Sequence, residues 1–148
     1  MTWKDLLTEG RIEELETSRK EIEDLRAVVA RDLADAEIEG LSPDRKFATA
    51  YNAALQSAKM VIRSSGYRVR GWLGAGHYVT FECLKLSMGK SIVQTANFLD
   101  RCRRKRNIAD YDLAGAVTAA EADEMLKKAK LFAKKAEKWI RDNHPKYG

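Results

Sequence analysis

The chain has 148 residues, enough for one domain whose core forms without a disulfide or a structural metal. Hydrophobic residues make up 45% and charged residues 33%, a composition that excludes a disordered chain. The chain has only 2 prolines and 9 glycines, and this low number disfavours sandwiches, barrels and repeat arrays. Residues 1–50 carry 8 basic and 13 acidic side chains, whereas residues 51–148 carry 19 and 9. The basic part suits a phosphate-rich partner, although a solvated helix face has the same composition.

A short helix and a long one are predicted in the acidic part of the chain. Thr2 is placed to cap a short helix over residues 2–7. Ser18 and Glu21 then form a capping box, in which the hydroxyl accepts a backbone N–H and the carboxylate reaches back. Apolar residues follow every three or four positions as far as Gly40, as on one face of a helix. These residues are Ile22, Leu25, Val29, Leu33 and Ala36.

The next helix is predicted to begin at Ser42-Pro43, an N-cap followed by proline at the first helical position, and to end near Gly66. Its apolar stripe consists of Phe47, Tyr51, Ala54, Ala58 and Ile62. The segment from Gly66 to Gly76 is the only long irregular one, and it mixes cations with aromatic side chains. These side chains are Tyr67, Arg68, Arg70 and Trp72. Binders of single-stranded RNA have such a mixture, but so does any exposed basic loop.

Three helices are predicted in the rest of the chain. One begins at His77 or Tyr78 and ends near Gly89, and the next begins near Ser91. The apolar face of this second helix consists of Ile92, Ala96, Leu99 and Cys102, and the helix ends in a basic run up to Asn107. The last helix opens with a second capping box, formed by Thr118 and Glu121, and ends before Pro145.

No segment shows convincing period-two alternation, so no strand is predicted. We therefore expect an all-α fold, an antiparallel bundle of four long helices plus a short N-terminal helix, in a single domain over residues 1–148. No apolar run reaches the roughly 18 residues of a membrane-spanning helix, and the acidic N-terminus is unlike a signal peptide. We therefore expect the protein to be located in the cytoplasm.

Several kinds of site are excluded. The sequence has no P-loop and no H-E-x-x-H motif, and its two cysteines form no C-x-x-C pattern. Gly71-x-x-Gly74-x-Gly76 has no predicted strand before it, so a dinucleotide-binding fold is not supported. With only two histidines, a histidine-rich metal site is excluded as well. We expect no cofactor and no metal.

The end of the basic helix is the most informative segment. Leu99, Cys102 and Arg106 step by three and four residues, so Arg106 continues an apolar stripe and must be paired, or face a cavity or an interface. Asn107 suits a left-handed helix end. On a continuous helix Arg106 and Tyr111 lie about 140° apart. They can converge only if the helix breaks near Asn107, or if a second subunit supplies one of them.

A plainer interpretation stays open for this segment. Arg106 can form an ion pair with Asp110 or Asp112, while Tyr111 packs as a core aromatic side chain. The other cations of the run can be a solvated patch that complements the negative end of the helix dipole. These cations are Arg103, Arg104 and Lys105.

Arg106-Asn107-x-x-x-Tyr111, at the end of a helix in an all-helical chain, resembles the signature of the HEPN (higher eukaryotes and prokaryotes nucleotide-binding) domain family. Four segments look like one bacterial branch of that family, and the resemblance covers roughly Leu33 to Ile140. The segments are Ala50–Leu55, Gly66–Arg68, Gly76–Tyr78 and Leu99–Asn107.

The resemblance implies a helical bundle, often a homodimer, and an arginine and histidine pair that forms a metal-independent endoribonuclease site of toxin or defence type. Other members are inactive or serve as partners of a small nucleotidyltransferase. Here Tyr111 stands in place of the histidine. The ordinary pKa of tyrosine is near 10 and that of histidine about 6.5, so tyrosine is a poor base at neutral pH. The substitution favours binding over cleavage, with activity weakened or lost.

We therefore expect a homodimer that binds RNA or nucleotide phosphates, with Arg106 as the phosphate clamp and Tyr111 or His77 handling protons if cleavage occurs. His77 serves only if the glycine-rich segment folds back toward Arg106; otherwise it simply packs at a helix start. Further substrate contacts are expected from Asn107, Arg103, Arg104, Lys105, Arg68 and Arg70. Two alternatives are a non-catalytic module that partners a nucleotidyltransferase antitoxin, and a structural protein whose basic face binds nothing specific.

Overall fold

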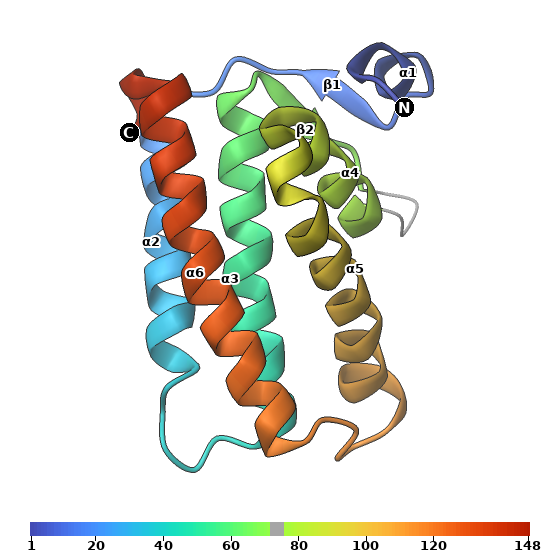
Figure 1. Cartoon of the computed structure of the whole chain (residues 1–148), viewed down its shortest axis with the longest axis vertical. Helices are drawn as coiled ribbons and strands as arrows, with labels where there is room; N and C mark the ends of the chain where they lie inside the picture. The colour runs from blue at the N-terminus through green and yellow to red at the C-terminus, as the bar shows by residue number, and fades with distance from the viewer. Residues whose placement is uncertain (72–75) are drawn as a thin grey trace.

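Helices make up most of the structure, which is a computed structural model (Figure 1). The structure describes residues 1–71 and 76–148; for residues 76 and 77 it describes the backbone alone. The predicted all-α class is confirmed. The helices are α1 (Trp3–Thr8), α2 (Arg19–Asp35), α3 (Pro43–Ser64), α4 (Gly76–Met88), α5 (Val93–Asn107) and α6 (Ala119–Asn143). In the described part of the chain, five helices of 13 to 25 residues thus follow α1; each corresponds to a segment predicted to be helical, and the predicted total of four long helices was one too few. None of the described helices is both long and apolar enough to cross a membrane.

Helix α3 is the centre of the molecule. It packs on α2, α4, α5 and α6 (Figure 1). Consecutive residues from Ala53 to Leu55, and again Ser57 and Ala58, are buried, so the helix is covered on most sides rather than along one stripe. The small alanine side chains let neighbouring helices approach closely, while Tyr51 fills the core against Phe81 of α4.

The helices differ in direction. Figure 1 shows α2 and α5 running against α3, and α6 running along it. The ion pair between Lys46 and Asp123 (2.6 Å) joins α3 and α6 near their N-terminal ends, as expected for helices that point the same way. Asp44, in the first turn of α3, accepts hydrogen bonds from the backbone N–H groups of Gly115 and Val117, just before α6.

A short antiparallel ribbon, β1 (Ile12–Glu14) with β2 (Tyr67–Val69), is an element that the sequence analysis missed. Each strand has three residues, too few for a visible alternation. The ribbon is held by packing, since Ile12 is buried and Tyr67 stacks on Trp3 at 4.2 Å between ring centroids. Gly66, with φ +95°, turns the chain from α3 into β2, a conformation that favours glycine.

Most of the predicted helix starts are confirmed. Thr2, Ser42 and Thr118 each accept a hydrogen bond from the backbone N–H three residues on. The capping box predicted at Ser18 is only half formed: Ser18 accepts from the Glu21 N–H. The Glu21 carboxylate instead accepts from the Thr17 hydroxyl and pairs with Arg63, and these contacts hold the pKa of Glu21 below its ordinary value.

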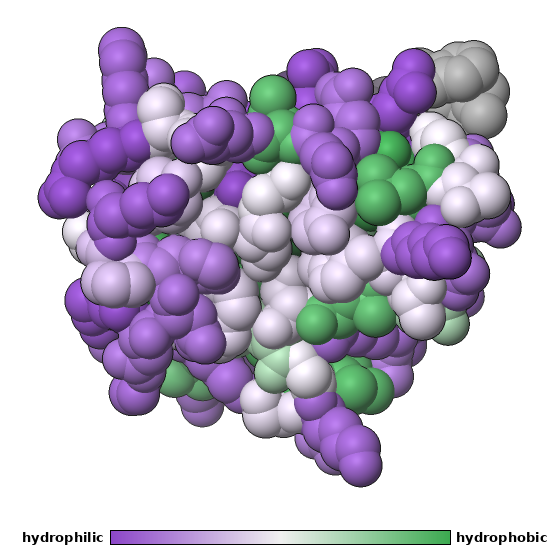
Figure 2. All heavy atoms as spheres, turned by 90° about the horizontal axis from the view of Figure 1, so that it is seen from above, coloured by the Kyte–Doolittle hydropathy of each residue, from purple (hydrophilic) through white to green (hydrophobic). Residues whose placement is uncertain are grey.

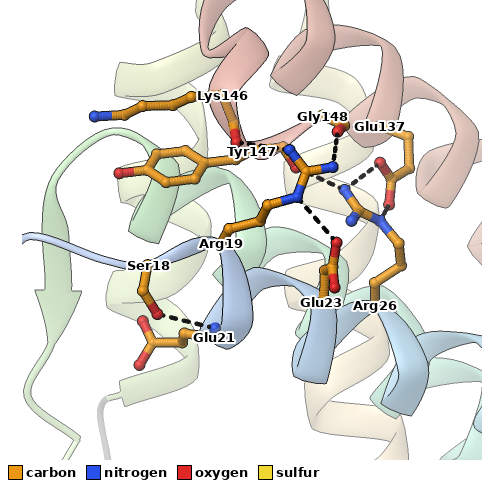
Figure 3. A network of polar contacts seen from close by, with 9 residues as sticks. All are labelled: Ser18, Arg19, Glu21, Glu23, Arg26, Glu137, Lys146, Tyr147 and Gly148. Carbon is orange, nitrogen blue, oxygen red and sulfur yellow. Dashed lines mark hydrogen bonds and ion pairs between the residues drawn. The ribbon is translucent and has the colours of Figure 1, made fainter.

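The C-terminal turn is fastened to α2 by two arginines (Figure 3). Arg26 donates to both oxygens of Glu137, at 2.6 and 2.9 Å, and to the backbone carbonyl of Tyr147. Arg19 donates to the carbonyls of Lys146 and Gly148. The end of the molecule that carries these contacts is mostly hydrophilic, with only separate hydrophobic side chains on its surface (Figure 2).

Candidate anion-binding site

A pocket of about 430 Å³ lies between α3, β2, α4 and the C-terminal part of α5. Five of its described lining residues are cationic and none is acidic; we call it the anion pocket. It is lined by Lys59, Ile62, Arg63, Arg68, Val69, Gly71, Thr80, Arg103, Arg106, Asn107 and Tyr111. Cations drawn from three separate elements therefore converge on one hollow, which a solvated helix face does not produce.

Helix α3 contributes Lys59 and Arg63, which are one helical turn apart and so share a face. Arg63 pairs with Glu21 at 2.8 Å. Lys59 is half-buried, and within the described residues its ammonium group makes no ion pair or hydrogen bond. Burial, and then the neighbouring charge of Arg63, lower the pKa of Lys59.

Helix α5 contributes Arg103 and Arg106, three residues apart. The Nε atom of Arg103 donates to Asp100 at 3.0 Å. The Cζ atom of Arg106 lies 5.6 Å from the centre of the Tyr51 ring, a cation–π contact with the core. Burial raises the pKa of Tyr51, while the charges of Arg106 and Arg103 act in the opposite direction.

The plainer interpretation of Arg106 is realised in part. Its Nε atom lies 3.1 Å from Oδ2 of Asp110, so the expected ion pair is present. The contact lacks hydrogen-bond geometry, however, and among the described residues this buried Nε has no hydrogen-bond partner. Its Nη1 atom makes only a long contact of 3.4 Å to Oδ1 of Asn107. Arg106 therefore keeps donor capacity for a ligand.

A π-helical turn over Ile108–Asp112, the π-turn, brings Arg106 and Tyr111 to the same pocket. The Leu113 N–H donates to the carbonyl of Ile108 at 2.9 Å, the five-residue spacing of a π-helix. The wider winding of this turn reduces the angle between Arg106, in the last turn of α5, and Tyr111, and both line the pocket. The predicted left-handed end at Asn107 is wrong: its φ of −63° and ψ of −40° are right-handed helical, and the chain changes its winding instead of reversing.

The structure gathers some of the predicted site residues and leaves others apart. Arg103, Arg106, Asn107, Tyr111 and Arg68 line the anion pocket, and Arg68 pairs with Glu13 at 3.5 Å.

Three predicted substrate contacts lie outside the anion pocket. Arg104 is exposed and pairs with Asp100, and Lys105 pairs with Glu121 on the side of α5 that faces α6. Arg70 is exposed beyond β2. The basic run of α5 is thus divided by the helical period, and only its Arg103–Arg106 face reaches the pocket.

His77 and Tyr111 are the two candidates for proton transfer. The side chain of His77 lies outside the described residues; its backbone belongs to the first turn of α4. Tyr111 is 75% exposed, so it is not the core aromatic side chain of the plainer interpretation.

Lys59 and Arg63 were missed by the sequence analysis. Both are single cations on an amphipathic helix that carries other polar residues, and nothing in the local pattern distinguishes them as site residues.

The arrangement suits the capture of an anion. The four carboxylates that pair with the arginines, Glu13, Glu21, Asp100 and Asp110, do not line the pocket. They hold the guanidinium groups from outside and leave other N–H donors for a ligand. No group of three or more metal-ligating side chains lies together in the described parts of the chain.

Comparisons with protein-family models, with curated proteins and with solved structures found no match. The site is therefore interpreted from its own geometry.

Proposed function

We propose that this protein is a HEPN-like helical domain that binds the phosphate groups of RNA or of a nucleotide in the anion pocket. The observation that carries the proposal is the convergence of five cations on a hollow with no described acidic lining residue. A phosphate group suits this set, because it accepts bidentate hydrogen bonds from guanidinium groups and balances several positive charges at once.

Lys59 and Arg106 are the central contacts of the proposed site. Lys59 is a half-buried charge without a described partner, and Arg106 has a buried Nε without a hydrogen bond. A phosphate oxygen in the pocket would pair with the ammonium group of Lys59 and with the outer N–H groups of the Arg106 guanidinium, whose Nε stays against Asp110. Surface cations that are fully solvated gain much less from an anion.

Binding, rather than rapid cleavage, is the proposed activity. Metal-independent cleavage of RNA needs a base that takes the proton of a ribose 2′-OH while the oxygen attacks the adjacent phosphate. In this proposal Arg106, which lines the anion pocket, would stabilise the charge that develops on the phosphoryl oxygens. Tyr111, at the position of the family's histidine, is a weak base at neutral pH, so any ribonuclease activity of this chain is expected to be slow.

A homodimer is part of the proposal. The π-turn and the residue after it expose three large side chains, Ile108 (41%), Tyr111 (75%) and Leu113 (62%). A two-fold interface that covers Ile108 and Leu113 would bring two anion pockets near each other.

Binding of a fluorescent single-stranded RNA, measured by anisotropy with a chelator present, tests the proposal. We expect the affinity to fall steeply with salt, because phosphate contacts release counterions. Binding that is absent at low salt, or that is equally strong in an Arg106→Ala variant, contradicts the proposed function.

A further inference from the structure

A second pocket, of about 550 Å³, adjoins the anion pocket, and Tyr111 lines both. The other described residues of the second pocket are Asp32, Ser42, Asp44, Arg45, Ala48, Thr49, Asn52, Ala109 and Asp110. The π-turn forms part of its wall, with Ala109, Asp110 and Tyr111. The same turn that brings Tyr111 to Arg106 therefore also opens a hollow next to it.

The two pockets carry opposite charge. Three carboxylates and one arginine line the second pocket, while five cations and no described carboxylate line the anion pocket. A phosphate group is attracted to one and repelled by the other. A ligand with a phosphate at one end and a neutral polar group at the other would be oriented by this difference.

The polar atoms of the second pocket are held in place. Asp32 is buried; its Oδ2 atom accepts from the Asn52 amide at 2.6 Å, and its Oδ1 atom pairs with Arg31 at 3.1 Å. Asp44 is fixed by the backbone N–H groups of Gly115 and Val117, and Asp110 by Arg106. An ionised carboxylate has about four acceptor positions, so each group retains capacity for N–H donors of a ligand.

Tyr111 presents an aromatic surface at the boundary. It is 75% exposed on the π-turn, and it has no aromatic or charged partner among the described residues. Exposed aromatic side chains beside a cationic groove are the platforms on which single-stranded nucleic acids stack their bases.

We propose that the second pocket is a nucleobase subsite: Tyr111 stacks on the base that adjoins the bound phosphate, and the acceptor-rich pocket selects a base with several N–H donors, guanine above uracil. This inference rests on the proposed function, since the anion pocket must hold the phosphate. Guanine offers adjacent ring N–H and amino donors that a carboxylate can accept as a pair, whereas uracil offers one ring N–H between two carbonyl oxygens, which carboxylates repel.

Isothermal titration with 5′- and 3′-guanosine monophosphate, the matching uridine monophosphates and ribose 5-phosphate tests the inference. Ribose 5-phosphate carries the phosphate and the sugar without the base. We expect the better guanosine monophosphate to bind at least about fivefold more tightly than ribose 5-phosphate, the lower range of a stacked base, and more tightly than its uridine counterpart. In Tyr111→Leu the ratio of guanosine monophosphate to ribose 5-phosphate affinity should fall toward one, and Tyr111→Phe should retain it.

The other outcomes of these titrations contradict the base subsite, the guanine preference or the proposed function. If ribose 5-phosphate and the nucleotides bind equally, or if Tyr111→Leu keeps the ratio, the base subsite is refuted while the proposed phosphate binding stands. Equal affinity for guanosine and uridine monophosphates refutes the guanine preference. If none of these compounds binds while the fluorescent RNA still does, the inference fails and the proposed function stands; if the RNA does not bind either, both fail. If Tyr111→Leu changes the sedimentation of the protein but not the ratio, Tyr111 is an interface residue and not a base platform.

Discussion

Arg106 and Tyr111 are five residues apart and line the same pocket, because the chain passes from an α-helix to a π-helical turn between them. Continued α-helical winding would direct them about 140° apart. The local change in winding therefore determines whether these two side chains can serve one ligand. π-Helical turns of this kind occur frequently at functional sites.

The first prediction concerns the contribution of Arg106 to RNA binding. Arg106→Ala should weaken binding about tenfold or more, since it removes charge-assisted hydrogen bonds inside a pocket, and should lower the salt slope by about one. Lys134→Ala is the matched control, because Lys134 is an exposed cation of α6 outside the pocket. Equal small losses in an anisotropy titration of both variants would show that the positive charge acts only as a general surface property.

The second prediction concerns Lys59, for which binding and stability should change in opposite directions. Lys59→Met keeps the length of the side chain and removes a half-buried charge, so phosphate binding should weaken about tenfold while resistance to urea increases.

The pH dependence of that stability gain follows from the lowered pKa of Lys59. The unfolded chain binds this proton more tightly than the folded one, so the charge opposes folding wherever the folded state is protonated. The gain of Lys59→Met should be full at neutral pH and should vanish as the pH rises past the ordinary lysine pKa. A variant that binds as tightly as the wild type, or is less stable at pH 7, contradicts this role.

Much of the fold was predictable because its signals are local. The N-caps at Thr2, Ser42 and Thr118 depend on residues three positions away, and they predicted where three helices start. The ribbon between β1 and β2 depends instead on residues more than 50 positions apart, such as Ile12 and Val69, and on packing beneath them. Nothing in a three-residue window reveals such a pairing.

Of the candidate site, the sequence predicted the residues at the end of α5 but not those of α3. Arg106 stood out because it continued an apolar stripe, and the structure indeed places it half-buried beside Tyr51. Lys59 and Arg63 become site residues only through the packing of α3 against α5, which no local pattern encodes. The π-turn was likewise hidden, since its i to i+5 hydrogen bond has no residue signature.

The third prediction concerns assembly. Leu113→Asp should convert a homodimer to a monomer in sedimentation velocity at tens of micromolar, because it places a charge in the exposed apolar patch beside the π-turn. Leu131→Asp is the control, since Leu131 is similarly exposed (56%) but lies on α6. A wild-type protein that sediments as a monomer, or two variants that dissociate alike, would argue against an interface at the π-turn.

The fourth prediction concerns RNA cleavage and the absence of a histidine at position 111. Wild-type protein with a chelator should cleave RNA slowly or not at all at neutral pH, because a phenol is about three to four pH units less acidic than an imidazolium. Tyr111→His supplies a base that titrates near neutrality on the same π-turn, in the same pocket as Arg106. Its rate should exceed that of the wild type by about a hundredfold or more, with a limb in the pH–rate profile near the ordinary histidine pKa.

The double variant Arg106→Ala/Tyr111→His is the control for that gain. A base alone cannot stabilise the charge that develops on the phosphoryl oxygens, so the double variant should lose the activity that Tyr111→His acquires. Rapid cleavage by the wild type in chelator would mean that Tyr111 or His77 is already a competent proton acceptor. If His77→Ala then abolishes that cleavage, the acid–base role belongs to the start of α4 and not to Tyr111 on the π-turn.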